Sequence, residues 1–295
     1  MNRRNFIKTS TLASTALVAP LSGFPSTWDK KKLKEIGVQI YTVRDDLQKD
    51  FEGTIKNIAN IGYSYLELFN YKEGKIYNQP IKAISKILAT HNIKATSLHV
   101  QTGAQTPKQD ATMGNNWERA VADAAEMGLK YMICAYLASD ERKSIDDYKR
   151  LADLFNKSGE VCQEYGIQFG YHNHDFEFIT LEDQVPYDLL LENTDKDLVK
   201  MELDLYWMAK AGRDPIHYFK AHPGRFPLWH VKDMSKNEQQ YFTEVGNGSI
   251  DWKSIFAQTK TSGMKQFFVE QDKCRDYSPL ESLTISYNYL RKLEF

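Results

Sequence analysis

Short apolar segments alternate with segments of helical periodicity along most of this chain, and this alternation constrains the fold more than any other feature. The segments between the apolar runs carry apolar residues three or four positions apart, as at Phe51, Ile55 and Ile58. Strands that alternate with helices predict a parallel sheet built from repeated strand–helix units. The eight expected strands cover residues 36–43, 63–69, 93–100, 131–136, 167–172, 199–205, 226–231 and 266–270.

Two folds show this alternation, the closed (β/α)₈ or TIM barrel and the open doubly wound sheet. A nucleotide-binding open sheet carries a glycine-rich loop after its first strand, and this chain has GVQIYTVRDD there instead. No low-complexity linker interrupts residues 34–295, and Asp214 and Ser278, each followed by proline, are typical of helix starts. We therefore expect one α/β domain, a TIM barrel over residues 34–295.

Residues 1–28 differ in character from the rest of the chain. Arg3, Arg4 and Lys8 precede a long uncharged run rich in alanine, serine and threonine, which is typical of a bacterial export signal of the twin-arginine kind. A disordered basic tail is the alternative. No apolar run has the length of a membrane-spanning helix, so we expect an exported, periplasmic protein whose mature form has no membrane span.

Charge and cysteine content exclude some classes of protein. Removal of the signal would take away Arg3, Arg4 and Lys8 and no acidic residue, which moves the formal net charge from −1 to −4. A mildly acidic chain without a basic stripe is not expected to bind nucleic acid. The three cysteines are odd in number and form no CxxC pair, so disulfides are not expected to be the framework of the fold.

Ionisable residues collect at the ends of the last four expected strands. Each group follows apolar strand residues, and the carboxyl ends of barrel strands meet on one face, where TIM barrels hold their active sites. Singly, such carboxylates are more often helix caps and such histidines structural, but together they provide two imidazoles and two carboxylates, which suit Mn²⁺, Co²⁺ or Zn²⁺ better than Ca²⁺. The four groups are residues 171–177, 201–207, 229–233 and 268–272.

The chain resembles a known family in these same segments. YHNHDFEF, MELDLYW, LWHVKDM and FFVEQD, in this order and after GVQIYTVRDD, are similar to the xylose isomerase-like TIM barrels. This sugar phosphate isomerase/epimerase group also includes inosose dehydratases, ketose 3-epimerases and endonuclease IV. The resemblance covers nearly all of residues 34–295 and implies one divalent metal ion (Mn, Co, Zn or Mg) held by residues of strands five to eight.

By motif position, the resemblance places the metal ligands at His172, Asp204, His230 and Glu270. The family commonly has glutamate where strand five of this chain has histidine, which leaves His174 as an alternative to His172. Both histidines have the same strand parity, so both can point inward. The resemblance also makes Glu270 the candidate catalytic base, with His174 and Lys232 as further candidate catalytic residues.

Other polar residues near strand ends are candidates for binding the substrate. Lys232, two residues after His230, can bind an oxyanion, although a salt bridge is an equal alternative. Glu177 can bind substrate hydroxyls or orient a ligand histidine through its second nitrogen. The remaining candidates are Gln39, Tyr41, Glu67, His99 and Tyr136.

The expected chemistry is proton abstraction next to a carbonyl, with a metal that stabilises the enediolate as a Lewis acid. We expect a carbohydrate isomerase or epimerase, with a lyase or dehydratase acting on a 3-keto-glycoside or inosose as the alternative. A non-catalytic sugar-binding barrel is the alternative from another class, and an endonuclease is disfavoured by the negative charge. Export favours an unphosphorylated small-molecule substrate, and the sequence leaves a homo-oligomer open.

Overall fold

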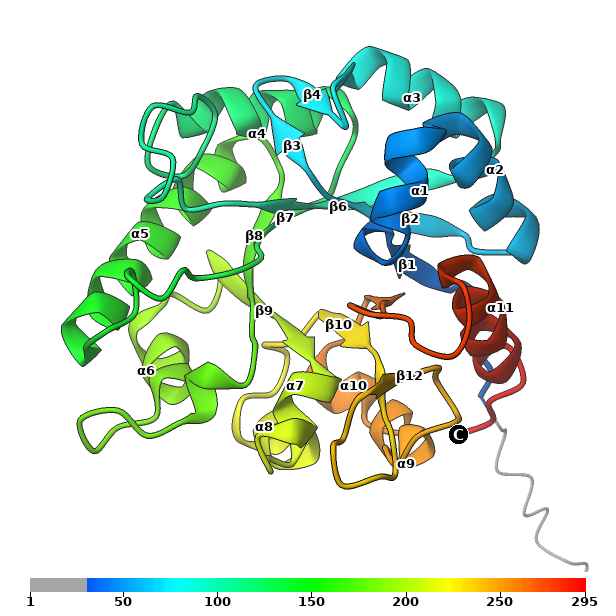
Figure 1. Cartoon of the computed structure of the whole chain (residues 1–295). Helices are drawn as coiled ribbons and strands as arrows, with labels where there is room; N and C mark the ends of the chain where they lie inside the picture. Colours follow the sequence, from blue (N-terminus) through cyan, green and yellow to red (C-terminus); the bar gives the residue numbers. More distant parts are fainter. Residues whose placement is uncertain (1–30) are drawn as a thin grey trace, which may run out of the picture. The chain divides into compact units, whose positions relative to one another are not determined.

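The structure, a computed structural model, describes residues 31–295. The expected export signal at residues 1–28 lies outside the described residues. Eight parallel strands close into a barrel in the order β1-β13-β10-β9-β8-β7-β6-β2 (Figure 1). The strands are β1 (Gly37–Gln39), β2 (Tyr65–Leu68), β6 (Lys94–Val100), β7 (Tyr131–Cys134), β8 (Gln168–His172), β9 (Val199–Asp204), β10 (Leu228–Val231) and β13 (Gln266–Val269). The predicted TIM barrel is confirmed.

Helices surround the barrel on the outside, as Figure 1 shows in the view along its axis. Their apolar faces pack against the outward-facing strand residues in one continuous core. The helices are η1 (Ile40–Val43), α1 (Arg44–Lys49), α2 (Phe51–Ile61), α3 (Ile81–Thr90), α4 (Trp117–Glu126), α5 (Ile145–Glu164), η2 (Phe176–Phe178), α6 (Pro186–Asn193), α7 (Leu205–Lys210), α8 (Pro215–Ala221), α9 (Trp252–Phe256), α10 (Thr259–Ser262) and α11 (Pro279–Leu290).

Local sequence signals set the ends of these helices. Asp214 and Ser278 each cap a helix whose first residue is proline, and Ser278 also forms a capping box with Glu281. Gly62 and Gly263 end α2 and α10 in the left-handed conformation, which glycine adopts without steric cost. The helix starts predicted at Asp214 and Ser278 are therefore confirmed.

The first strand is shorter than the sequence predicts. Residues 36–43 read as one strand, but β1 ends at Gln39 and residues Ile40–Val43 form a 3₁₀ helix. The side-chain oxygen of Gln39 accepts a hydrogen bond from the backbone N–H of Tyr41 at 3.0 Å and so caps this turn. Ile40, Thr42 and Val43 are buried in either conformation, which is why hydrophobicity did not distinguish them.

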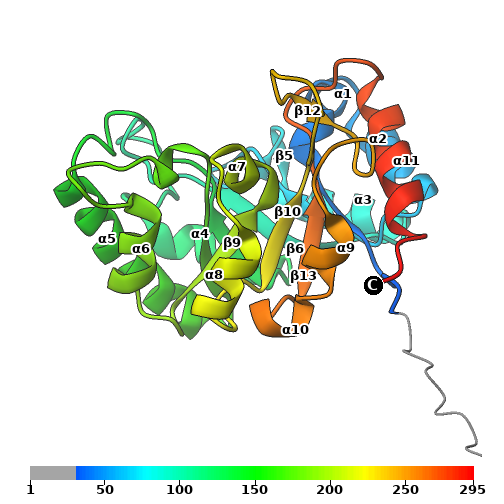
Figure 2. The ribbon, with the colours of Figure 1, turned by 90° about the horizontal axis from the view of Figure 1, so that it is seen from below.

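Two additions rise from the carboxyl ends of the strands, the side at the top of Figure 2, where α7 leaves β9. A three-stranded sheet follows β2 and a hairpin follows β10. Among the helices of residues 31–295, none is long and apolar enough to cross a membrane. The additional strands are β3 (Tyr71–Lys72), β4 (Lys75–Ile76), β5 (Gln79–Pro80), β11 (Asp233–Met234) and β12 (Phe242–Thr243).

Candidate active site

The inward-facing side chains of the barrel change from apolar to polar along its axis. Tyr65, Ile133, Leu228 and Phe268 form an apolar cluster that is separate from the core outside the barrel. Successive inward positions on a strand lie two residues apart, so the next residues on the same strands include Glu67, His230 and Glu270. The barrel is therefore a packed apolar plug beneath a polar interior at the carboxyl ends of the strands.

Glu67 lies at the centre of the lower polar level and is fully buried. Its Oε2 lies 2.5 Å from His230 Nε2 and 3.0 Å from His99 Nε2, and it accepts a hydrogen bond from Gln39 Nε2 at 2.9 Å. Its Oε1 accepts a hydrogen bond from Ser97 at 2.5 Å. We call Gln39, Glu67, Ser97, His99 and Glu202 the inner layer.

Glu202 contributes the second carboxylate of the inner layer. Its Oε2 lies 3.0 Å from His99 Nε2, 3.1 Å from His172 Nδ1 and 3.1 Å from His230 Nε2. Strand register explains one of these contacts, because His172 on β8 is directly paired with Glu202 on β9. The sequence reasoning missed Glu202, although it lies two residues before Asp204 and shares its inward parity.

The two carboxylates set the charge of the surrounding imidazoles. Burial alone would lower the pKa of His99, but Glu67 and Glu202 outweigh burial and raise it to about 9. His230 also has a raised pKa, since the carboxylates of Glu202, Glu270 and Glu67 overcome its burial. Burial and the neighbouring His230 instead lower the pKa of His172 well below its usual value, so that its imidazole is neutral.

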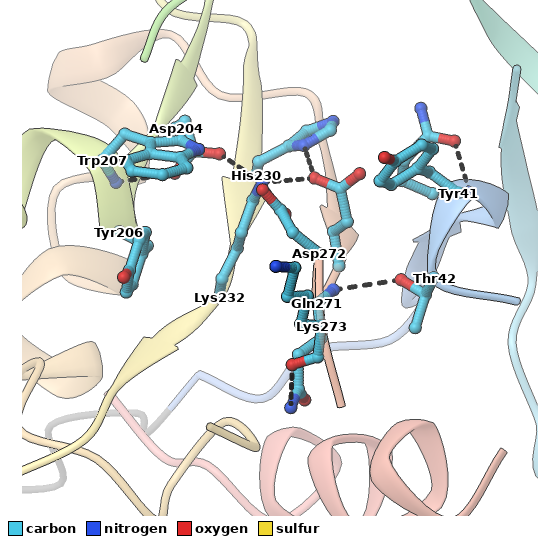
Figure 3. A network of polar contacts seen from close by, with 12 residues as sticks. Tyr41, Thr42, Asp204, Tyr206, Trp207, His230, Lys232, Gln271, Asp272 and Lys273 are labelled. Atoms are coloured by element: carbon cyan, nitrogen blue, oxygen red, sulfur yellow. Dashed lines mark hydrogen bonds and ion pairs between the residues drawn. The ribbon is translucent and has the colours of Figure 1, made fainter. Parts of the chain in front are cut away.

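A second polar level lies nearer the carboxyl ends of the strands, and we call Asp204, His174, Lys232, Glu270 and Asp272 the upper layer. Figure 3 shows Asp204, Lys232 and Asp272 converging from β9, β10 and the segment after β13. The Lys232 ammonium lies 2.9 Å from Asp204 Oδ2, 2.5 Å from Glu270 Oε2 and 2.7 Å from Asp272 Oδ1. Lys232 is thus an ion-paired residue whose cation is shared among three carboxylates.

His230 connects the two layers through its two ring nitrogens. Its Nδ1 lies 2.9 Å from Glu270 Oε2 in the upper layer, while its Nε2 faces Glu67 and Glu202 in the inner layer. His172 does the same, because its Nε2 lies 3.5 Å from Asp204 Oδ2 and its Nδ1 faces Glu202. Each histidine thus turns one nitrogen towards the upper layer while a carboxylate holds the other.

The donor atoms present fit a divalent cation. Asp204, His230 and Glu270 bring ligand atoms within 4.8 Å of one another, and His99, His172, Glu202 and His230 form a second such group. Asp204 Oδ2 is buried and has no hydrogen-bond partner among the described residues, although it contacts the Lys232 ammonium. Burial raises the pKa of Asp204 to about 6 despite that ammonium. An incompletely satisfied carboxylate beside two imidazoles is a donor set that Zn²⁺, Mn²⁺ or Co²⁺ accepts.

The geometry favours His172 over His174 as the strand-five ligand. His172 belongs to one of the two candidate groups, and His174 belongs to neither. The His174 ring stacks on Phe176 and lies beside Tyr136, and its buried Nδ1 has no partner within residues 31–295. Burial, together with the charge of Lys232, lowers the pKa of His174 to about 3, so the ring is neutral.

A cavity of about 300 Å³ opens above the upper layer. Asp272 and the aromatic ring of Phe69 also lie on its wall, and neither was predicted. Asp204 and His230 are completely buried and reach the cavity only through their neighbours Lys232 and Glu270. Of the predicted site residues, those that line the cavity are Tyr41, His99, Tyr136, His172, His174, Lys232 and Glu270.

Three predicted substrate-binding residues lie outside this cavity. Gln39 and Glu67 are bonded to each other in the inner layer and have no exposed surface. Glu177 is also fully buried; it accepts hydrogen bonds from the Tyr171 hydroxyl and, at 2.8 Å, from the backbone N–H of His174. Glu177 therefore holds the backbone after β8 and contacts no ring nitrogen. This geometry favours supporting roles for all three over contact with the substrate.

Comparison with known proteins gives relatives along most of the chain. The model of the family described as xylose isomerase-like TIM barrel matches residues 55–293. An inosose dehydratase of Lacticaseibacillus casei is 23% identical over 299 residues, which cover 90% of this chain and 94% of that protein. An inosose dehydratase of Clostridium perfringens is 22% identical, with 79% of this chain and 82% of that protein covered.

Solved structures agree with these relatives. A sugar phosphate isomerase/epimerase from Parabacteroides distasonis superposes with a TM-score of 0.78 at 29% identity, covering 88% of this chain and 99% of that one. The IolI protein with a bound zinc atom superposes with a TM-score of 0.67 at 15% identity, covering 86% and 95%, which shows a common fold. The prediction that this chain is an enzyme is confirmed by these similarities. The chain belongs to the xylose isomerase-like TIM barrel family.

Proposed function

We propose that this protein is a metal-dependent lyase that removes water or another β-leaving group from a keto-sugar or keto-cyclitol through an enediolate. The observation that carries the proposal is the convergence of Glu270, Asp204, His230 and Lys232 beneath a cavity of sugar size. Relatives named inosose dehydratase, one of them aligned over 90% of this chain, support elimination over the isomerisation that the sequence alone led us to expect.

His172, Asp204, His230 and Glu270 would hold one divalent ion. When bound, such an ion supplies Lewis acidity that favours negative charge on the oxygens of a keto-sugar. The choice among Zn²⁺, Mn²⁺, Co²⁺ and Mg²⁺ rests on two imidazoles and two carboxylates, a set that places the softer ions ahead of Mg²⁺. Glu67 and Glu202 accept from the far nitrogens of the histidines and so fix the orientation of both rings.

Glu270 is the residue best placed to take the proton from the carbon beside the carbonyl. Burial alone would raise the pKa of Glu270, but Lys232 and His230 keep it well below its usual value, so the carboxylate is charged at neutral pH. Lys232 faces the same cavity and keeps its proton, because Asp204, Asp272 and Glu270 raise its pKa against the effect of burial. It can stabilise the enediolate oxygen and give a proton to the leaving hydroxyl.

A second candidate function is isomerisation or epimerisation of the same substrate class. The structural relative from Parabacteroides distasonis carries that name at 29% identity. Both reactions begin with the same proton abstraction and differ in whether the enediolate is reprotonated or loses a neighbouring group. A barrel that binds a sugar and catalyses neither reaction is the remaining alternative.

We also propose that the substrate carries no phosphate and is met outside the cytoplasm. The charged groups on the cavity wall include Glu270 and Asp272, and the Lys232 cation is already shared among carboxylates, so a phosphate dianion would meet repulsion there. In residues 1–28, basic residues are followed by a long uncharged run, and this pattern supports export.

The experiment is a turnover assay in deuterated water with free, phosphorylated and 3-keto sugars and with inososes. The expected result is elimination of one unphosphorylated keto substrate, lost on treatment with a chelator and restored by Mn²⁺, Co²⁺ or Zn²⁺. Deuterium incorporation without elimination would replace the lyase by the isomerase. Metal-loaded protein that neither exchanges a proton nor eliminates on any of these sugars would overturn both, and Glu270→Gln serves as the inactive control.

A further inference from the structure

A second, smaller cavity continues from the active-site cavity along the ends of β2, β6 and β7. It measures about 140 Å³ and shares Phe69, His99 and Tyr136 with the active-site wall. We infer that it is a second subsite, which takes a sugar ring glycosidically linked to the ring that reacts. The inference rests on the proposed function in one respect, namely that the larger cavity takes a sugar.

The lining of the second cavity suits a pyranose. Phe69, Tyr71 and Tyr136 offer aromatic surface, and Tyr136 as a residue is 51% exposed. Polar side chains that include Lys72 and Gln101 surround this aromatic surface. A pyranose has apolar C–H faces and a rim of hydroxyls, so it matches rings for its faces and amide or ammonium groups for its rim.

The polar lining residues are available to a ligand. Within residues 31–295, the side chains of Lys72, Gln101 and Gln109 form no hydrogen bond or ion pair. Their backbone, by contrast, is held: the backbone oxygen of Gln101 accepts from Met113 N–H at 3.2 Å and that of Gln109 accepts from Asn115 Nδ2 at 3.0 Å. Donors and acceptors free of protein partners beside an aromatic-lined cavity can form hydrogen bonds to the hydroxyls of a ligand.

Both walls of the second cavity are braced on the same helix. The Tyr71 hydroxyl donates to Asp123 on α4 at 2.6 Å, and Arg119 of α4 pairs with Asp110 in the loop after β6. Figure 1 shows β3 and β4 next to α4, as these contacts require. Because these contacts hold both walls before a ligand arrives, binding need not order the backbone of the walls.

The position of the second cavity also indicates how a two-ring substrate would lie. His99 and Tyr136 belong to both cavities, so a ligand passes directly from one to the other. The reacting ring would sit over Glu270 and Lys232, and the linked ring would extend towards Lys72 and Gln101. In the proposed elimination, the linked ring is either the group that leaves or a ring that stays attached to the product.

The test measures binding without turnover, by calorimetry on the full chain loaded with Mn²⁺. The probes are methyl glucosides and the unoxidised glucose disaccharides maltose and cellobiose. We expect one disaccharide to bind about tenfold more tightly than the methyl glucoside of the same anomeric configuration. Gln101→Leu and Lys72→Met should each lower that gain about fivefold, which corresponds to roughly one hydrogen bond, and leave methyl glucoside binding unchanged.

Matched controls lie in the same two segments. Gln105→Leu in the loop after β6 and Lys75→Met on β4 replace exposed residues that do not line the cavity, and both should bind like the wild type. Equal affinity for methyl glucosides and disaccharides would overturn the second subsite. An equal gain with phenyl glucoside that survives Gln101→Leu and Lys72→Met would also overturn it, in favour of an apolar aglycone.

The outcome is separable from that of the proposed function. A disaccharide gain in a protein that eliminates nothing would leave the subsite standing and remove the lyase. Elimination from keto-monosaccharides, with disaccharides binding no more tightly than methyl glucosides, would support the lyase and remove the second subsite.

Discussion

The inner layer and the upper layer of the barrel both place carboxylates beside histidines, but the surroundings of these carboxylates differ. Glu67 and Glu202 lie two residues deeper on their strands than the cavity floor and bind only imidazoles, an amide and a hydroxyl of the chain. Glu270 and Lys232 lie on the cavity wall. A displacement of one inward position along a strand thus separates carboxylates that hold ligands from a carboxylate that can meet the substrate.

This difference is informative because the two layers share His172 and His230. Each ring presents one nitrogen to the upper layer and the other to a buried carboxylate. Glu202 and Glu67 would thus orient the two histidines that would hold a metal in the upper layer. The two layers can be distinguished experimentally, since loss of an upper carboxylate should stop chemistry while loss of an inner one should weaken metal binding.

Glu270→Gln should have the largest effect, a fall in kcat of about 10³-fold or more, because it removes the proposed base together with one metal ligand. The protein should remain folded, since Gln has nearly the same shape and Glu270 is on the cavity wall. Turnover of the substrate identified above and a thermal melt provide the two measurements. Glu126→Gln on the outer surface of α4 is the control, and turnover within tenfold of wild type in Glu270→Gln would rule out the base.

Lys232→Met should lower kcat/KM by about 10²-fold through loss of oxyanion stabilisation. Metal affinity should stay the same or rise, because the ammonium competes with the metal for Asp204 and Glu270. Titration with Mn²⁺ under calorimetric detection measures this. A tenfold loss of metal affinity would instead make Lys232 a support of the metal site.

Glu202→Gln should lower metal affinity about 10–100-fold, the usual cost of losing a carboxylate that orients ligand histidines. At saturating metal, most of the wild-type kcat should return, because Glu202 does not reach the cavity. This recovery separates the inner layer from the upper one. If kcat stays low at every metal concentration, Glu202 participates in the chemistry and the distinction between the layers fails.

The sequence predicts the barrel and the strand-end residues of the upper layer. Side chains alternate in direction along a strand, and the carboxyl ends of parallel strands share one edge, so both features can be inferred from the order of residues. It did not identify Glu202 or Asp272, although each has the inward parity of a predicted neighbour. The depth of a residue inside the barrel depends on the stagger between strands, which no local pattern records. For this reason Gln39 and Glu67 were expected in the cavity and lie below it.

The second cavity could be predicted from the sequence even less than the depth of the inner layer. Its walls come from residues 69–72, which include the two-residue strand β3, from the end of β6 and the loop after it, and from the segment after β7, and these pieces are too short to show a period in the sequence. Their positions depend on contacts distant in sequence, such as Tyr71 with Asp123, 52 residues apart. Such contacts are fixed only when the barrel closes, so the sequence gives no indication of them.

The smallest expected effect concerns Glu177, a buried carboxyl that belongs to neither layer and has no cation among its hydrogen-bond partners. Burial raises its pKa to about 8, well above the value near 4.3 of an unfolded chain. The folded state therefore holds this proton more tightly, and its contribution to stability, complete below pH about 4, is lost as the pH rises towards 8. In Glu177→Gln the uncharged amide offers a carbonyl acceptor and an NH2 donor group at every pH, which resembles the protonated carboxyl.

The variant should thus melt within about a degree of the wild type at pH 5 and a few degrees above it at pH 8.5. Melting curves from pH 5 to 9 measure the difference, with exposed Glu182→Gln as the control that should follow the wild type. Parallel curves for Glu177→Gln and wild type would mean that Glu177 is ionised in the folded protein. In that case the Tyr171 hydroxyl and the His174 backbone amide, with the charge of Arg142 nearby, would suffice to hold a buried carboxylate that has no cation among its hydrogen-bond partners.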